Sequence, residues 1–186
     1  MELKKRELIH RGSILDYYCD EMEFKNGSIE KWDYIDHKPV VAIVPYEEDG
    51  KIVCVKQYRH AVTEESIEIP AGGINDGESP MEGALRELRE ETGYICDMKT
   101  VKPLIEMYTS VGYTNELIYI FEGKIIGKTN RELDLNEDID VIRLSQQDLK
   151  QMILNNEIKD GKTIGAIMSF INKWFRICGN ITKCID

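Results

Sequence analysis

Long hydrophobic runs and regular cysteine spacings are both missing from this chain of 186 residues. No window approaches the roughly 18 consecutive apolar residues that a membrane-spanning helix needs, so we expect no membrane contact. The stretch MELKKRELIH at the start lacks the apolar segment of a secretion signal. The five cysteines include no CxxC pair. These absences favour the reducing cytoplasm and buried or inactive thiols.

Positive charge is also in deficit. The chain has 24 lysines and arginines against 34 aspartates and glutamates, for a net charge of −10. Such a surface repels nucleic acid phosphates, so we expect no DNA or RNA partner. Small phosphorylated ligands remain compatible with this charge if a divalent cation bridges the repulsion.

The order of predicted elements indicates an α+β fold with a mixed sheet. Segments 14–24 and 28–36, with a turn at Asn26-Gly27, predict a β-hairpin. The later elements predicted from apolar patterning are strands over 40–46, 51–58, 117–123 and 139–144 and helices over 145–156 and 164–175.

One further predicted helix concentrates acid on one side. Ser79-Pro80-Met81-Glu82 has the capping-box pattern, and Gly93 supplies a stop. At about 100° per residue, an apolar stripe faces the core and three glutamates share another face. Arg86 and Arg89 fall on the remaining side. The crowded acids are Glu87, Glu90 and Glu91.

Crowded carboxylates repel each other, and a bound cation would remove that repulsion. Three carboxylates on one face offer the oxygen ligands that Mg²⁺ prefers. A solvated acidic face is the alternative interpretation of the helix taken alone. The preceding stretch IEIPAGGINDGE is a strand that runs into a glycine-rich loop, where backbone groups can approach a phosphate or metal closely. This context favours the cation site.

The whole segment reads G-x5-E-x7-R-E-L-x-E-E-x-G-Y. It resembles the Nudix box, with agreement at nine defined positions over 23 residues. These positions are Gly72, Glu78, Arg86, Glu87, Leu88, Glu90, Glu91, Gly93 and Tyr94.

The resemblance extends beyond the box, over roughly residues 8 to 176. VKQYRHAVTEESIEIPAGG, YTSVGYTNE and KDGKTIGAIMSFINKW are similar to the ADP-ribose pyrophosphatase branch of the Nudix hydrolases. The resemblance implies an α/β/α sandwich over 37–186 and a small β-subdomain over 1–36 that exchanges contacts in a homodimer. It also implies hydrolysis of a nucleoside diphosphate sugar with Mg²⁺, for which Mn²⁺ can substitute. ADP-ribose would give AMP and ribose 5-phosphate.

The family's metal-binding acids match Glu87, Glu90 and Glu91. A backbone carbonyl in its metal shell matches Ala71. The resemblance assigns structural roles in the motif to the remaining matched positions, of which Glu78 and Arg86 orient the loop and helix. These positions are Gly72, Glu78, Arg86 and Gly93.

Three further residues are candidates for substrate binding. Arg59 matches a family arginine that contacts phosphate or ribose, and an exposed arginine at a strand end is the alternative interpretation. Glu68 would bind substrate or brace the loop. Trp32 matches an aromatic ring placed against the adenine of the partner subunit, whereas a packing role is the simpler reading of a tryptophan on a strand.

The family places its catalytic base on the loop after the sheet. Leu135 replaces one of the acids that relatives often carry there. Glu137 is our first candidate for the base. Glu116 is the second candidate, and it could instead hold the terminal ribose. The third alternative needs no side chain, because bridging metal ions already acidify water.

Two other functions remain open. A related enzyme would hydrolyse another nucleotide sugar such as GDP-mannose, and Val111 stands where relatives usually have proline in a segment that separates substrates. A non-catalytic Nudix module would bind a nucleotide as a sensor. Sensor modules commonly lose box acids, so the intact box favours the enzyme.

Overall fold

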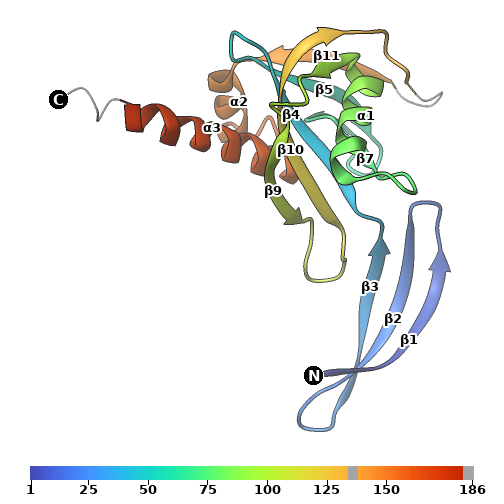
Figure 1. The fold of residues 1–186 in the computed structure, drawn as a ribbon. Coiled ribbons are helices and arrows are strands. Elements are labelled where there is room, and N and C mark those ends of the chain that lie inside the picture. The colour runs from blue at the N-terminus through green and yellow to red at the C-terminus, as the bar shows by residue number, and fades with distance from the viewer. Residues whose placement is uncertain (134–137, 182–186) are drawn as a thin grey trace.

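The computed structural model describes residues 1–133 and 138–181, with side chains up to Lys173 in the last helix. Its strands form two separate sheets (Figure 1). The smaller sheet is antiparallel and has the order β1-β2-β3. Its members are β1 (Glu2–Arg11), β2 (Leu15–Glu23) and β3 (Ile29–His37). Figure 1 shows this sheet extending away from the rest of the molecule.

The larger sheet is mixed, as predicted. Its main path runs β11-β5-β4-β10-β8, with β6 beside β5, β7 beside β4 and β9 beside β10. The central strands β4 and β10 pair in parallel, and the other pairings are antiparallel. The strands are β4 (Val40–Tyr46), β5 (Ile52–Arg59), β6 (Glu64–Glu68), β7 (Ala71–Gly73), β8 (Tyr94–Cys96), β9 (Lys102–Tyr108), β10 (Leu117–Lys128) and β11 (Ile139–Leu144).

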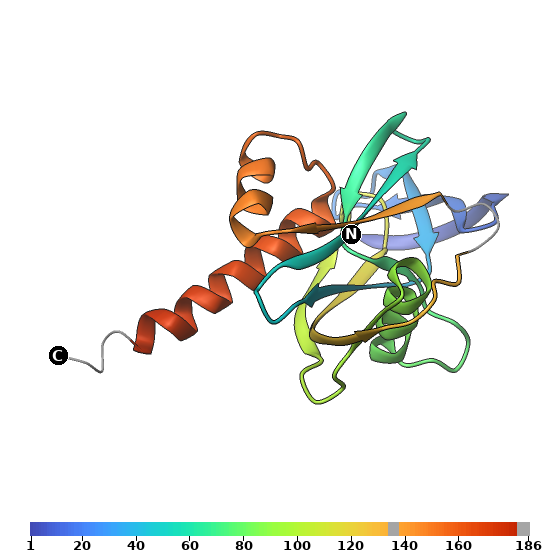
Figure 2. The same cartoon turned by 90° about the horizontal axis from the view of Figure 1, so that it is seen from above.

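The helices cover both faces of this sheet (Figure 2). They are α1 (Pro80–Thr92), α2 (Gln146–Leu154) and α3 (Gly161–Ile181). Successive side chains of a strand point to opposite faces. Ala42 and Val44 therefore belong to the core under α2 and α3, while Val41 and Ile43 belong to the core under α1. The predicted α/β/α sandwich is confirmed.

The small sheet contains one strand that the sequence did not predict. The β2–β3 hairpin turns at Gly27, which has a φ of 82°, as expected for the Asn-Gly turn. The unpredicted strand is β1. Its ten residues are all exposed, and its sequence ELKKRELIHR shows no regular alternation of apolar and polar residues. Arg6 ties β1 to β2 through two hydrogen bonds to the buried Asp20, of 2.8 and 2.6 Å.

The caps of α1 form as the sequence predicts. The Ser79 hydroxyl accepts a hydrogen bond from the Glu82 backbone, and the Glu82 carboxylate accepts one from the Ser79 backbone. Gly93 closes the helix with a φ of 74°. At the start of α2, the Ser145 hydroxyl accepts a hydrogen bond from the Asp148 backbone. These local interactions fix where α1 begins and ends, and so where its acids lie.

Two of the five cysteines are buried, as we expected for thiols with no regular spacing. Cys54 and Cys96 lie in the core, and burial raises the pKa of each thiol to about 12. Cys19 is also a free thiol, while Cys178 and Cys184 fall beyond the described side chains. Within the described chain, no helix combines the length and apolarity needed to cross a membrane.

Candidate active site

A cleft of ≈ 900 Å³ lies where the small sheet meets the larger one. The β1–β2 turn (12–16) and the β3–β4 junction (36–40) form one wall. The loop at 71–73, the strand end at Arg59, and the start of α3 contribute the other side. Both sheets of one chain therefore build this cleft.

Hydrogen bonds join the end of β3 to the loop before β10. The Ile35 amide donates to the Tyr113 carbonyl at 2.7 Å, which ties β3 to the loop before β10. The Asn115 side chain accepts from the His37 amide at 2.9 Å and donates to Asp36 at 2.6 Å. No motif in the sequence marks Asn115 as a site residue, because its hydrogen-bond partners lie almost eighty residues away along the chain.

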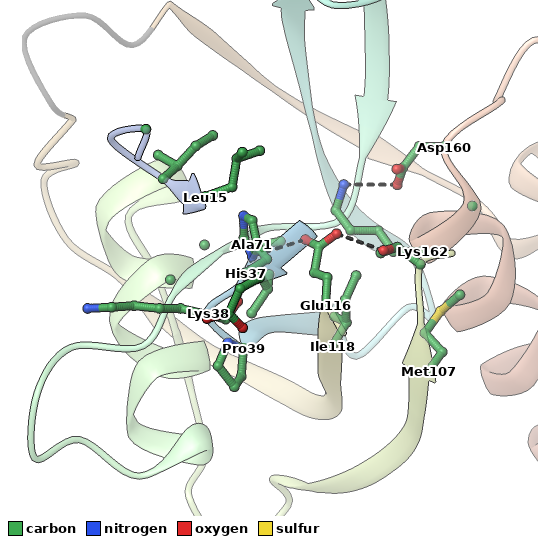
Figure 3. A pocket seen from close by; sticks show the side chains of 18 of the residues that line it. Leu15, His37, Lys38, Pro39, Ala71, Met107, Glu116, Ile118, Asp160 and Lys162 are labelled. Atoms are coloured by element: carbon green, nitrogen blue, oxygen red, sulfur yellow. Dashed lines mark hydrogen bonds and ion pairs between the residues drawn. The ribbon is translucent and has the colours of Figure 1, made fainter. Parts of the chain in front are cut away.

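Glu116 lines the cleft beside this junction (Figure 3). Its carboxylate accepts a hydrogen bond of 2.7 Å from the Thr109 hydroxyl. Nδ1 of His37 lies 3.8 Å from its other oxygen. This predicted site residue is held by Thr109, which follows β9, and lies beside His37 at the end of β3.

Arg86 organises the acidic face of α1. Its Nη1 donates to Glu87 at 2.7 Å and to Glu90 at 2.9 Å. Its Nε and Nη2 donate to Glu78, and Nη2 also donates to the Gly73 carbonyl at 2.7 Å. The hydrogen bonds to Glu78, and then those to Glu87 and Glu90, raise the pKa of Arg86 despite its partial burial.

The i,i+4 spacing of Arg86 and Glu90 predicts an ion pair that relieves part of the repulsion among the acids, and this pair forms. The long side chain of Arg86 also reaches Glu87. The positions at i+1 and i+4 come within range of the guanidinium, since a flexible stem can turn along the helix surface. The expected structural role in orienting loop and helix agrees with these contacts to Gly73 and Glu78.

The loop before α1 packs directly on the acids. The Ala71 amide donates to the Glu91 carboxylate at 3.3 Å, and Glu91 is buried. A Cβ atom at Gly72 would overlap the carboxyl group of Glu87. Any larger residue at this position would displace the Glu87 carboxylate from the place it takes beside the loop. The loop that carries the predicted metal-binding carbonyl of Ala71 therefore lies against two of the predicted acids, Glu87 and Glu91.

The donors of this site suit a hard divalent cation. Carboxylate oxygens with a backbone carbonyl are ligands that Mg²⁺ prefers. Over the described chain, no three histidine, cysteine, aspartate or glutamate side chains converge closely enough to hold a metal in this arrangement. Arg86 reaches both Glu87 and Glu90. Because a carboxylate has about four acceptor positions, it can face Arg86 and also ligate a cation after its side chain turns.

The NUDIX domain family model matches residues 36–164, which include the cleft-lining loop and the whole of α1. The chain belongs to the Nudix family. The resemblance that the box indicated is thereby confirmed, and the protein is a Nudix hydrolase.

Relatives of this Nudix chain match along most of its length. An ADP-ribose pyrophosphatase of Bacillus subtilis is 35% identical over 87% of this chain and 88% of its own. A methanol dehydrogenase activator of Bacillus methanolicus is 36% identical over 88% of each chain. A crystal structure of an ADP compounds hydrolase superposes with a TM-score of 0.83, covers 96% of this chain and 95% of its own, and is 19% identical. That structure supports the Nudix fold.

Glu68 is buried beneath the Nudix cleft, where it contacts two of the residues that line it, Arg59 and Lys162. Arg59 donates to both of its oxygens, at 2.8 and 2.7 Å, and Lys162 lies 2.5 Å from one of them. Burial alone would raise the pKa of Glu68, but the Arg59 hydrogen bonds and the Lys162 charge lower it to about 2. Of our two alternatives for Glu68, this geometry favours bracing.

One predicted site residue, Trp32, lies outside the cleft. It is 43% exposed and packs edge-on against Phe24, with ring centroids 6.0 Å apart. Its expected role against a partner's adenine stays a prediction. Glu137 and Leu135 lie outside the described residues, so the candidate base stays a prediction from the sequence.

Proposed function

We propose that this Nudix hydrolase cleaves ADP-ribose to AMP and ribose 5-phosphate in a reaction that depends on Mg²⁺. The observation that carries the proposal is the shared cleft of the box loop, Arg59 and Glu116. The cleft brings the Arg59 guanidinium and the Glu116 carboxylate together with the loop that packs on the acidic helix. The name of the Bacillus subtilis relative supports the choice of substrate.

The box would hold the metal through Glu87, Glu90, Glu91 and the Ala71 carbonyl. Mg²⁺ bound there would neutralise the pyrophosphate oxygens and lower the pKa of the attacking water. Arg86 keeps the acids and the Gly73 carbonyl together. Arg59 would donate hydrogen bonds to a phosphate or ribose oxygen, and Glu116 would accept one from a ribose hydroxyl.

A substrate panel tests this proposal. We expect ADP-ribose to give a kcat/KM at least about tenfold above those for GDP-mannose, NADH and dinucleoside polyphosphates. AMP and ribose 5-phosphate should be the products, and excess chelator should abolish the reaction. A preference for GDP-mannose would support the related nucleotide-sugar hydrolase instead. Nucleotide binding without turnover of any compound in Mg²⁺ would support the sensor module.

We also propose that residues 1–36 form a subdomain through which the chain dimerises, with residues 37–186 as the Nudix domain. The small sheet leaves large apolar side chains uncovered on the chain itself. Three strands are too few to form a core of their own, so a partner that covered these side chains would stabilise the sheet. The exposed side chains are Leu3, Leu8, Ile9, Ile29 and Trp32.

Sedimentation at micromolar concentration should therefore show a dimer, and Trp32→Glu should shift it toward monomer. A buried interface tryptophan is typically a strong contributor to binding, and a carboxylate there would lose its solvation. Lys31→Glu is the matched control, because neighbouring side chains of β3 point to opposite faces. A monomeric parent protein would contradict the proposal.

A further inference from the structure

The first turn of α3 binds the segment that leads into the box loop. The Thr163 hydroxyl accepts a hydrogen bond of 2.9 Å from the Ile69 amide, and both residues are buried. Lys162 reaches the adjacent Glu68 at 2.5 Å and Asp160 at 3.0 Å. Figure 3 shows Lys162 pointing toward Asp160 at the edge of the cleft. Asp160, Lys162 and Thr163 lie in KDGKTIGA, which contributes to the family resemblance but contains no predicted site residue.

Glu68 connects Lys162 to Arg59. Arg59 grips the Glu68 carboxylate through Nε and Nη2, a two-point geometry that fixes the plane of the guanidinium. Its third nitrogen, Nη1, makes no hydrogen bond to any other described residue. The Arg59 side chain is 44% exposed and lines the cleft. Nη1 therefore remains for an anionic ligand.

Lys162 also sets the charge of this wall. Arg59 and Lys162 balance Glu68 and Asp160, so the four side chains are neutral together. Without the lysine, the group would carry one net negative charge beside the place where a diphosphate would bind. Glu68 would also lose one of the two cations that offset its burial, and a buried carboxylate with incomplete pairing is costly. Lys162 is itself only 12% exposed.

We propose that Lys162 is a positioning residue, which holds the Glu68 carboxylate and through it orients Arg59 toward the diphosphate of the substrate. The identity of the ligand rests on the proposed function, whereas the coupling between Lys162 and Arg59 does not. The sequence could not show this coupling, since more than ninety residues separate Lys162 from Glu68.

Steady-state kinetics on the full chain with ADP-ribose and Mg²⁺ tests the consequence for substrate. We expect Lys162→Met to raise KM about tenfold with kcat within about threefold, because the lost interaction acts on substrate binding. Lys162→Arg should restore most of the affinity by keeping the charge. Lys159→Met is the matched control, since Lys159 pairs with the exposed Glu64 and does not line the cleft. Unchanged KM in Lys162→Met would overturn the inference.

A double-mutant cycle separates positioning from a direct or merely structural role. In an Arg59→Ala background, Lys162→Met should change KM by less than about twofold, because residues that act through one another are not additive. Fully additive effects would overturn the inference. Lys162→Gln provides a second uncharged variant that keeps a hydrogen-bond donor, and it should show the same dependence on Arg59.

An NMR measurement tests the coupling without substrate. The Nε–Hε cross peak of Arg59 can be assigned by its loss in Arg59→Lys. We expect this peak to shift or broaden in Lys162→Met and Lys162→Gln, and to stay in place in Lys159→Met. An unmoved peak in both Lys162 variants would overturn the inference. A parent chain that does not hydrolyse ADP-ribose would overturn the proposed function, while this spectrum would still decide whether Lys162 positions Arg59.

Discussion

Glu91→Gln should lower kcat by about 10²–10³-fold, the range for removal of one preorganised electrostatic group. Glu91 is buried and accepts a hydrogen bond from the Ala71 amide. Glutamine can keep that hydrogen bond, so we expect the fold to survive. It cannot supply the negative charge that a divalent cation at this site would need. Glu87→Gln should have an effect of similar size, because it also removes one anionic ligand of the proposed metal site. The Glu87 carboxylate lies against the box loop at Gly72.

Glu82→Gln is the matched control on the same helix. It removes the same charge, but the capping box accepts glutamine at this position, and the Glu82 carboxylate faces Ser79. Its kcat should equal that of the parent protein. Melting curves recorded alongside the kinetics would show whether any loss of rate follows from unfolding. Activity near the parent value in folded Glu91→Gln and Glu87→Gln would contradict the metal site that we propose.

The second large effect concerns the base that activates water. We expect Glu137→Gln to lower kcat by about 10²–10⁴-fold with a modest change in KM, the range for loss of a general base. Glu116→Gln should act mainly on KM. Glu116 already accepts a hydrogen bond from Thr109 and lies beside His37 in the cleft wall, which suits a residue that holds substrate.

Glu132→Gln removes an exposed acid from the same loop region and serves as the control. A larger loss of kcat in Glu116→Gln than in Glu137→Gln would reverse our assignment of the two acids. If neither variant lowers kcat tenfold, the alternative without a side-chain base is favoured. Comparing kcat and KM separately is necessary, because a residue that binds ground state and transition state equally changes KM alone.

The sequence by itself determined the features that depend on neighbours in the chain. The Ser79 cap, the capping box and the Gly93 stop define α1 within one turn at each end, so the positions of its acids followed from helical geometry. The strands β4 and β5 were also evident, since each contains a buried run of four apolar residues, 41–44 and 52–55. The nine matched positions of the box identified the family before any contact was visible.

Only the tertiary structure decided the contacts between distant segments. The exposed strand β1 carries no periodic apolar signal, and it is held by pairing with β2 and by the Arg6–Asp20 pair. Arg86 donates hydrogen bonds to Glu78 and to the Gly73 carbonyl, which lie in the loop before the helix, as well as to acids of the helix itself. Lys162 meets Glu68 because α3 packs its first turn against the segment before the box. Periodicity and spacing report the local backbone, whereas such pairings depend on how the sheet brings remote segments together.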